Sequence, residues 1–210
     1  MSGRGRATAT AAATEHADVT TGSLAIAAVT AVLTNVLQNS LAHGVGSLVG
    51  DALVSALPPD RLPTGADERA RLNLYLYRVT PSTRWRAANG AGPAPLALDL
   101  HSLLTAYGER DLEAEILLGQ AALTLHATPT LTVAALDAAL QAVALERSGA
   151  AAQTRAAFGV PGLAALLGEL TLVLEFLGTE ESSRLWSALQ ARCRPSLAFK
   201  VATVTLGGAT

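Results

Sequence analysis

Charged residues are scarce in this sequence: they make up 15% of its 210 residues, against 50% hydrophobic residues, and the formal net charge is −2. A chain this apolar can bury a core, so its ordered part should be globular rather than disordered. The near-neutral charge provides no attraction to nucleic acid or to an anionic membrane, and we expect neither as a partner. The low charge is also either a mild indication of oligomerisation or a consequence of the alanine-rich composition.

Cysteine and lysine occur once each, as Cys193 and Lys200. A single cysteine excludes an intrachain disulfide and fits assembly in a reducing compartment. A lone cysteine is more often a small packed hydrophobe than a nucleophile. The glycines at 44, 46 and 50 lack the G-x-G-x-x-G spacing, and no P-loop lysine follows them. Phosphoryl transfer is therefore poorly supported.

Histidines with metal-ligand spacing are also absent. His16, His43, His101 and His126 are far apart, and no cluster of cysteine or carboxylate accompanies them. Asp99 and His101 lie two apart on a predicted strand and would share a face, an arrangement that can orient a catalytic imidazole. No G-x-S-x-G nucleophile elbow occurs, so a structural pair is the preferred interpretation. We expect no enzyme activity, no cofactor and no metal.

Long apolar runs are missing as well. Leu24–Leu37 is shorter than the roughly 20 residues of a bilayer crossing, and Glu169 and Glu175 interrupt Val160–Leu177. The basic N-terminus has no apolar run directly behind it, so we expect no secretory signal. We expect no direct membrane insertion.

What is present is a mixture of helical and strand periods. We expect a disordered tail over residues 1–21 and a domain over residues 22–210. Alternation predicts strands, and i, i+3, i+4 spacing predicts helices. Strands are expected at Leu72–Thr80, Leu96–Tyr107 (by length also readable as a helix), Leu170–Leu177 and Ser196–Leu206; helices are expected from an N-cap at Ser23 to about Gly44, weakly at Leu48–Leu57, at Leu112–Leu125, after Thr130 or Thr132, and after an N-cap at Thr179.

These elements predict an α/β (α+β) fold in a single domain. A mixed sheet of about four strands would be packed by four to five helices. The first two strands are expected to pair as a hairpin with a long loop over residues 82–95.

Two segments are candidates for protein contact. Arg84, Trp85 and Arg86 stand together in the predicted loop, and arginine and tryptophan are common at binding hot spots. The alternative is that Trp85 folds back over the sheet. The C-terminal strand, with Phe199, Val201 and Thr203, is β-branched and nearly uncharged. At a sheet edge it could pair with another chain, and in a central position it could not.

A family resemblance rests on several segments in a fixed order, not on a catalytic motif. The segments are the runs 73–81, 85–86, 95–101, 103–108 and 113–119, then His126 and 128–129, and last 183–189. Together they resemble the N-terminal domain of the cap, or tail-terminator, proteins of extracellular contractile injection systems of the antifeeding-prophage and virulence-cassette type. The resemblance runs from about residue 24 to residue 206.

The resemblance implies a phage tail-terminator-like domain that assembles as a homohexamer. Such a cap ends the inner tube and anchors the last sheath layer at the end far from the baseplate. Its partners would be its own copies and the tube and sheath proteins, in a particle assembled in the bacterial cytoplasm and either kept there or released on lysis. The alternative is an adaptor that links the particle to a membrane protein or an effector. Many relatives continue into a further β-rich domain, whose function we expect to be absent here.

Overall fold

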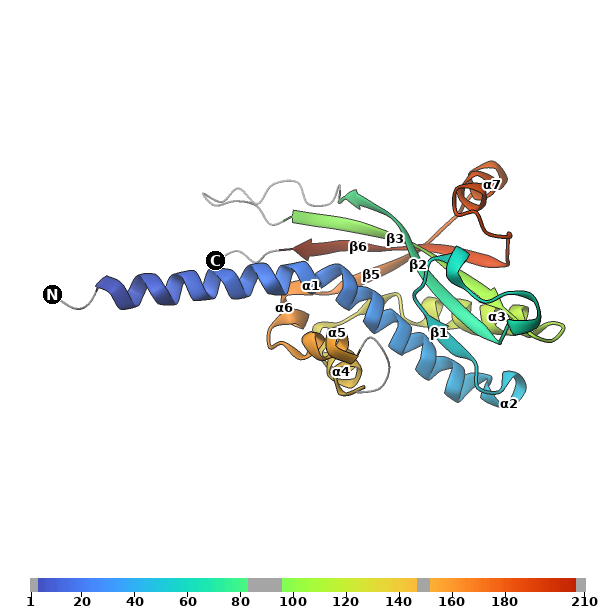
Figure 1. Cartoon of the computed structure of the whole chain (residues 1–210), viewed down its shortest axis with the longest axis horizontal. Helices are drawn as coiled ribbons and strands as arrows, with labels where there is room; N and C mark the ends of the chain where they lie inside the picture. Colours follow the sequence, from blue (N-terminus) through green and yellow to red (C-terminus); the bar gives the residue numbers. More distant parts are fainter. Residues whose placement is uncertain (1–3, 83–95, 147–151, 207–210) are drawn as a thin grey trace.

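One mixed sheet organises the molecule (Figure 1). The computed structural model describes residues 4–82, 96–146 and 152–206, with side chains from residue 21 onward. Within these ranges the sheet has six strands in the order β1-β2-β3-β6-β5-β4. β1 pairs parallel with β2, and every other pair is antiparallel. The strands are β1 (Leu53–Ser55), β2 (Arg71–Pro81), β3 (Leu96–Tyr107), β4 (Thr130–Leu131), β5 (Leu170–Glu175) and β6 (Ser196–Leu206).

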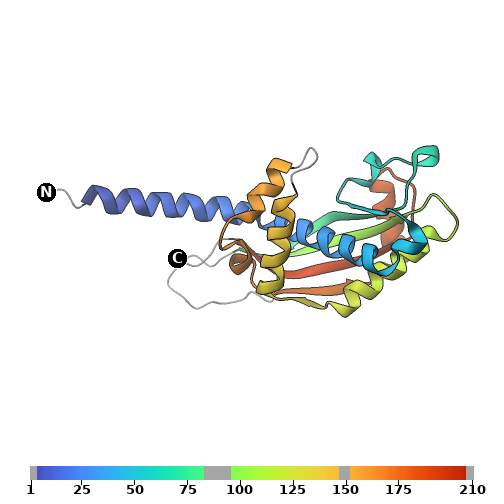
Figure 2. The same cartoon turned by 90° about the horizontal axis from the view of Figure 1, so that it is seen from below.

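The helices lie mostly on one face of this sheet. α1 and α3 pack directly against it, α4 packs against α1, and α7 lies on the opposite face (Figures 1 and 2). The predicted α/β class with a mixed sheet is confirmed, and its four long strands are the four expected from alternation. The helices are α1 (Arg4–Gly44), α2 (Gly46–Val49), α3 (Glu113–Ala127), α4 (Val133–Leu145), α5 (Ala152–Ala156), α6 (Leu163–Leu167) and α7 (Thr179–Ala188), with short 3-10 turns at Pro59–Arg61, Gly65–Asp67 and Ala157–Gly159.

α1 begins earlier than the sequence suggested. We expected an N-cap at Ser23, but the helix starts at Arg4 and passes through Ser23. Alanine has the highest helix propensity, and residues 7–17 are rich in it, so nothing in that stretch stops a helix. The N-terminal part of α1 projects beyond the sheet in both views (Figures 1 and 2). The division into a tail up to residue 21 and a domain from residue 22 stays a prediction.

Part of α1 is apolar enough to span a membrane by length and composition. Thr21–Gly44 spans 24 residues, longer than the run considered from the sequence, and a stretch of 18 residues within it has a mean hydropathy of 1.5. A core helix passes the same test, and this helix buries one continuous stripe at i, i+3 and i+4 spacing. That stripe is Ala25, Ala28, Val29, Val32, Leu33, Leu37 and Leu41.

The segment after α1 was predicted incorrectly. We expected a weak helix over Leu48–Leu57, but α2 ends at Val49, and Gly50, with a φ of +67°, turns the chain into β1. Glycine is the residue that adopts this left-handed φ without steric cost. β1 is then held by a side chain distant in sequence: Gln38 Oε1 accepts from the Val54 N–H at 2.8 Å.

Two predicted helix caps had different outcomes. Thr132 caps α4, its hydroxyl accepting from the Ala135 N–H at 3.3 Å, as one of the two expected positions. Thr179 was expected to cap α7, but the N-cap residue is Gly178, and Thr179 is the first helical residue. Asp or Glu in the first turn suits the positive end of the helix dipole, and Glu180 and Glu181 fill that place.

Candidate interaction surface

β6 lies in the middle of the sheet, between β3 and β5. The hypothesis that this strand pairs with another chain at a sheet edge is therefore wrong. Phe199 and Val201 are 0% and 1% exposed and belong to the core beneath α1. Thr203 lies in a bulge next to β3, with a φ of +62°. Alternation of apolar residues predicts that a segment is a strand, but it does not predict which strands lie next to that segment in the sheet.

The other predicted contact residues, Arg84, Trp85 and Arg86, lie outside the described residues. The strands that flank them are well defined. β2 and β3 pair antiparallel from Arg71 opposite Tyr107 to Pro81 opposite Leu98. The predicted hairpin between these strands is therefore confirmed.

Asp99 and His101 do not pair with each other, contrary to our expectation. His101 Nδ1 lies 2.8 Å from Glu175 Oε2, and its Nε2 lies 3.0 Å from the Thr80 hydroxyl. Glu175 is on β5, and β6 lies between it and His101 on β3. The β6 residue opposite Glu175 is Ala198, whose small side chain lets the Glu175 side chain pass over β6 to the imidazole. The imidazole therefore connects β2 to β5 across the face of the sheet opposite α1, which we call the polar face.

Asp99 has its own set of partners on the polar face. It accepts from the Thr203 N–H at 3.0 Å and from Lys200 Nζ at 3.2 Å. Burial raises the pKa of Asp99, but hydrogen bonds from the Thr203 N–H, the Ser82 hydroxyl and Lys200 outweigh it, so the pKa lies below its usual range. The carboxylate holds the bulge of β6, where a non-glycine residue has a positive φ.

The contacts from Glu175 to His101 and from His101 to Thr80 resemble the acid, histidine and hydroxyl of a hydrolase triad. Such a triad needs a hydroxyl open to substrate and hydrogen-bond donors aimed at a developing oxyanion. Here the His101 residue is only 5% exposed. The strand segments beside it lie in register in the ladder, with Arg78 opposite His101 and Thr80 opposite Asp99. We interpret the three residues as a structural cross-link between strands.

Tyr77 adjoins this network at a β-bulge of β2. Its ring centroid lies 6.3 Å from that of His101, and its hydroxyl is buried without a hydrogen-bond partner among the described residues. Burial, and after it the Glu175 carboxylate, raises the pKa of Tyr77. Sequence periodicity placed Tyr77 on a strand, but it gave no signal that Glu175 would lie nearby.

The two sides of the sheet end differently. β1 covers only residues 71–73 of β2, and the rest of that strand carries a bulge at Tyr77, the charge of Arg78 and the imino nitrogen of Pro81. These are common devices that keep an edge from pairing. At the other side, β4 covers only residues 170 and 171 of β5. β5 continues with Leu174, and the exposed Phe176 follows it.

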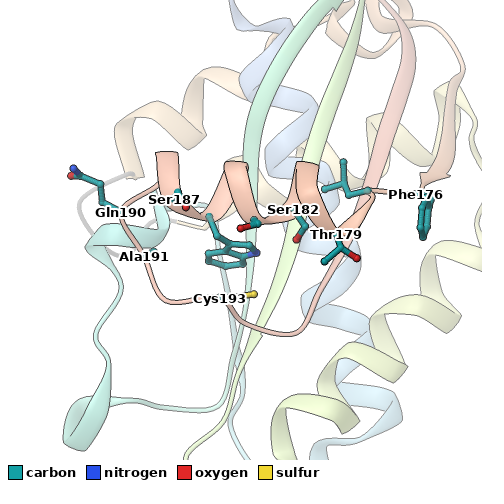
Figure 3. Close-up of a pocket in the computed structure, with 10 residues that line it drawn as sticks. Phe176, Thr179, Ser182, Ser187, Gln190, Ala191 and Cys193 are labelled. Atoms are coloured by element: carbon teal, nitrogen blue, oxygen red, sulfur yellow. The ribbon is translucent and has the colours of Figure 1, made fainter.

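A groove of about 640 Å³ lies under α7, next to the end of β5. Figure 3 shows Phe176 at one end of it, beyond Thr179, and Cys193 below the helix. Trp186 also lines the groove. Trp186 is 4% exposed and packs with Leu103 and Ala198 of the sheet, which fixes α7 in place. The sequence places Phe176 in a predicted strand and Trp186 in a predicted helix, but no pattern in it indicated that the two border one hollow.

Groups of histidine, cysteine and carboxylate residues suited to a metal ion do not occur in the described ranges. Cys193, the single cysteine, is exposed beside the groove and not a packed hydrophobe as expected. Its exposure follows from its place in the short connection between α7 and β6.

The family model described as the Pvc16 N-terminal domain matches residues 28–210. No curated protein matches the chain.

Two solved structures resemble the fold. One is the sheath/tube terminator of the PVC extracellular contractile injection system in its extended state: identity is 16%, coverage is 82% of this chain and 57% of that one, and the TM-score is 0.45. The other is the tube-terminating cap of the anti-feeding prophage: identity is 18%, coverage is 82% and 54%, and the TM-score is 0.41. This chain thus spans little more than half the length of either protein. The family match confirms the resemblance seen in the sequence, and the chain belongs to the family of Pvc16 N-terminal domains.

Proposed function

We propose that this chain is a structural cap that performs no chemistry. It ends the inner tube of a contractile injection system and anchors the last sheath layer at the end far from the baseplate. The observation that carries the proposal is the match of residues 28–210 to the Pvc16 N-terminal domain. That match covers both faces of the sheet, the polar network and the α7 groove.

The organisation of the polar face supports a structural role. His101, Asp99 and Lys200 are held by contacts with other strands of the sheet. Groups fixed in this way stiffen the sheet, which is what a subunit that must stop a growing tube requires. A catalytic group, by contrast, has to keep a position open for its substrate.

We also propose that the cap is a homohexamer, formed by the chain alone or only on a tube end. A closed ring needs heterologous contacts, in which one surface of each copy meets a different surface of the next. The low charge of the sequence supports such contacts, because the cores of interfaces are depleted in charged residues. In this proposal the particle assembles in the bacterial cytoplasm.

The test is to delete the gene and measure the particles by electron microscopy. A cap that ends the tube predicts particles of uncontrolled length or with detached sheaths, because nothing then stops polymerisation at the distal end. The intact gene supplied in trans should restore a single length. Particles of normal length with intact sheaths in the deletion strain would contradict the proposal.

A map of the assembled particle separates the cap from the adaptor alternative. The cap predicts this chain at the end far from the baseplate, in six copies. An adaptor that links the particle to a membrane protein or an effector need not lie there, and its loss would leave tube length unchanged.

A further inference from the structure

β5 is left incomplete at its outer edge. The Leu172 N–H donates to Pro129 O at 2.8 Å, which places the peptide group of Leu172 on the side that faces away from β6. Peptide groups alternate along an antiparallel strand, so the peptide group of Leu174 points to the same side. In the described part of the chain, β4 covers only Leu170 and Thr171, Pro129 next to it lies opposite Leu172, and no hydrogen bond reaches the outward N–H or C=O of Leu174.

Pro129 is the reason that β4 stops there. It lies directly between the C-cap of α3, Thr128, and the first residue of β4, Thr130. Proline has no N–H to donate, so it cannot return the second hydrogen bond of the pair with Leu172. The residues before Pro129, which could have covered Leu174, belong to the end of α3 and not to a strand.

The side chains along this edge are apolar and exposed. Leu174 is 51% exposed and Phe176 is 92% exposed. The charged residue between them, Glu175, turns to the polar face and binds His101. Natural proteins usually protect an edge with charges, proline or a bulge, as β2 does here. An unprotected edge with exposed apolar side chains indicates a surface that is covered in use.

The α7 groove continues this edge. Phe176 and Leu177 line it together with Trp186, so a chain that leaves β5 beyond Phe176 meets the groove next (Figure 3). Beyond that point the first turn of α7 carries Glu180 and Glu181, both exposed. Arg184 pairs with Glu180 at 2.5 Å, whereas Glu181 presents its carboxylate to solvent. A segment bound here would gain from a basic residue at this end.

The same β5 edge of a second copy fits here poorly. In an antiparallel pair centred on Leu174, Phe176 of one copy would lie opposite Leu172 of the other, whose N–H already donates to Pro129, so this register stops after one residue pair. A pair centred on Glu175 would set the two Glu175 side chains directly opposite each other, and like charges in that position are unfavourable. A strand without a neighbour of its own can pair along the whole free edge.

We propose that the β5 edge and the α7 groove together bind an extended segment of another protein. That segment is apolar at alternate positions and ends in lysine or arginine. It adds to the sheet as a strand: its backbone pairs with Leu174 and Phe176, one apolar side chain enters the groove beside Trp186, and the basic end lies near Glu181. This inference stands apart from the cap function and does not depend on it.

The test uses the full-length protein labelled with nitrogen-15 and a synthetic probe. The probe is a capped peptide of alternating valine and threonine that ends in two lysines. Two N-methylated versions serve as matched controls, because each removes the N–H groups from one edge of the peptide strand only. We expect the amide signals of residues 172–178 to shift on titration, with one N-methylated peptide binding at least tenfold more weakly and the other unchanged.

Variants locate the site on the protein. Leu174→Pro removes the outward N–H together with the exposed leucine side chain, and Phe176→Ala removes the exposed ring; each should weaken binding at least tenfold. Leu145→Ala changes a side chain that is 70% exposed on α4, remote from this edge, and should bind as the unmodified chain does. The N-methylated peptides keep the test valid even if Leu174→Pro does not fold.

Three results would overturn the proposal. The first is no shift at residues 172–178 at millimolar peptide. The second is equal binding of both N-methylated peptides, which would mean that the groove takes side chains without strand pairing. The third is a shift at β5 that grows with protein concentration alone, which would show that a second copy fills the edge.

Discussion

The buried carboxylates of this protein lock its backbone. Glu113 is 4% exposed and accepts from the N–H groups of Glu109 and Arg110 at 2.8 and 3.1 Å, and from the Arg110 guanidinium. It thereby fixes the turn from β3 into α3, in which Leu112 has a φ of +66°. Asp99 does the same for Thr203. In both places a carboxylate holds a left-handed residue that is not glycine, a conformation that costs free energy and needs such support.

The first prediction concerns Glu113 and pH. Burial raises the pKa of Glu113, but hydrogen bonds from Arg110 and from the two backbone N–H groups outweigh it, so the folded pKa lies below the usual value. Its contribution to stability is therefore complete above the unfolded pKa of about 4.3 and disappears as the pH falls through the folded pKa. We expect Glu113→Gln to lower the free energy of unfolding by about 1–3 kcal/mol at pH 7, and the loss to shrink toward pH 3.

Urea unfolding at both pH values measures this difference. Glu115→Gln is the matched control, because Glu115 lies in the same first turn of α3 but is exposed, so a change within about 0.5 kcal/mol is expected at either pH. A loss for Glu113→Gln that is equally large at pH 7 and pH 3 would show that the residue acts through its shape and not its charge.

At the scale of elements, the long strands were predictable and the short ones were not. β2, β3 and β6 alternate over many residues between turn formers, and their observed bounds lie within about one residue of those expected. β1 and β4 contain three and two residues, too few to carry a period. They exist because distant groups bind them: Gln38 holds β1, and Leu170 and Thr171 pair with β4.

Strand order was also beyond the reach of periodicity. β5 and β6 show similar apolar alternation, but β6 has a paired strand along both edges, whereas β5 is covered on its outer edge only at residues 170 and 171 within the described chain. The difference arises from the chain between them: α7 crosses to the opposite face, so β6 returns between β3 and β5. The partly uncovered edge that we expected on β6 is found on β5.

The second prediction separates packing from propensity within one helix. Leu117 and Leu123 both lie on α3, but Leu117 is 0% exposed and Leu123 is 66% exposed. Leu117→Ala leaves a cavity against the sheet and should lower the free energy of unfolding by about 2–5 kcal/mol. Leu123→Ala should change it by about 0.5 kcal/mol or less. Thermal unfolding of both variants measures this, and equal losses would contradict the burial of this helix face.

At the scale of the whole molecule, the polar network needed the sheet order before it could be seen. The sequence offered Asp99 as the neighbour of His101, because residues two apart on a strand share a face. The observed contact runs to Glu175, 74 residues later in the chain, across β6. No local pattern contains that information, whereas the family could be identified from segments spread along the chain.

The last prediction tests whether this network performs chemistry. In a nucleophilic mechanism the Thr80 hydroxyl, 3.0 Å from His101 Nε2, would be the attacking group, and Thr80→Val would abolish the activity while leaving assembly intact. In a structural cap the same change removes one hydrogen bond, so we expect a loss of about 0.5–1.5 kcal/mol in the free energy of unfolding. Particles carrying Thr80→Val should then keep normal length, intact sheaths and normal function. Particles that assemble normally but lose their function would contradict a purely structural role, because such a loss would not arise from a failure of assembly.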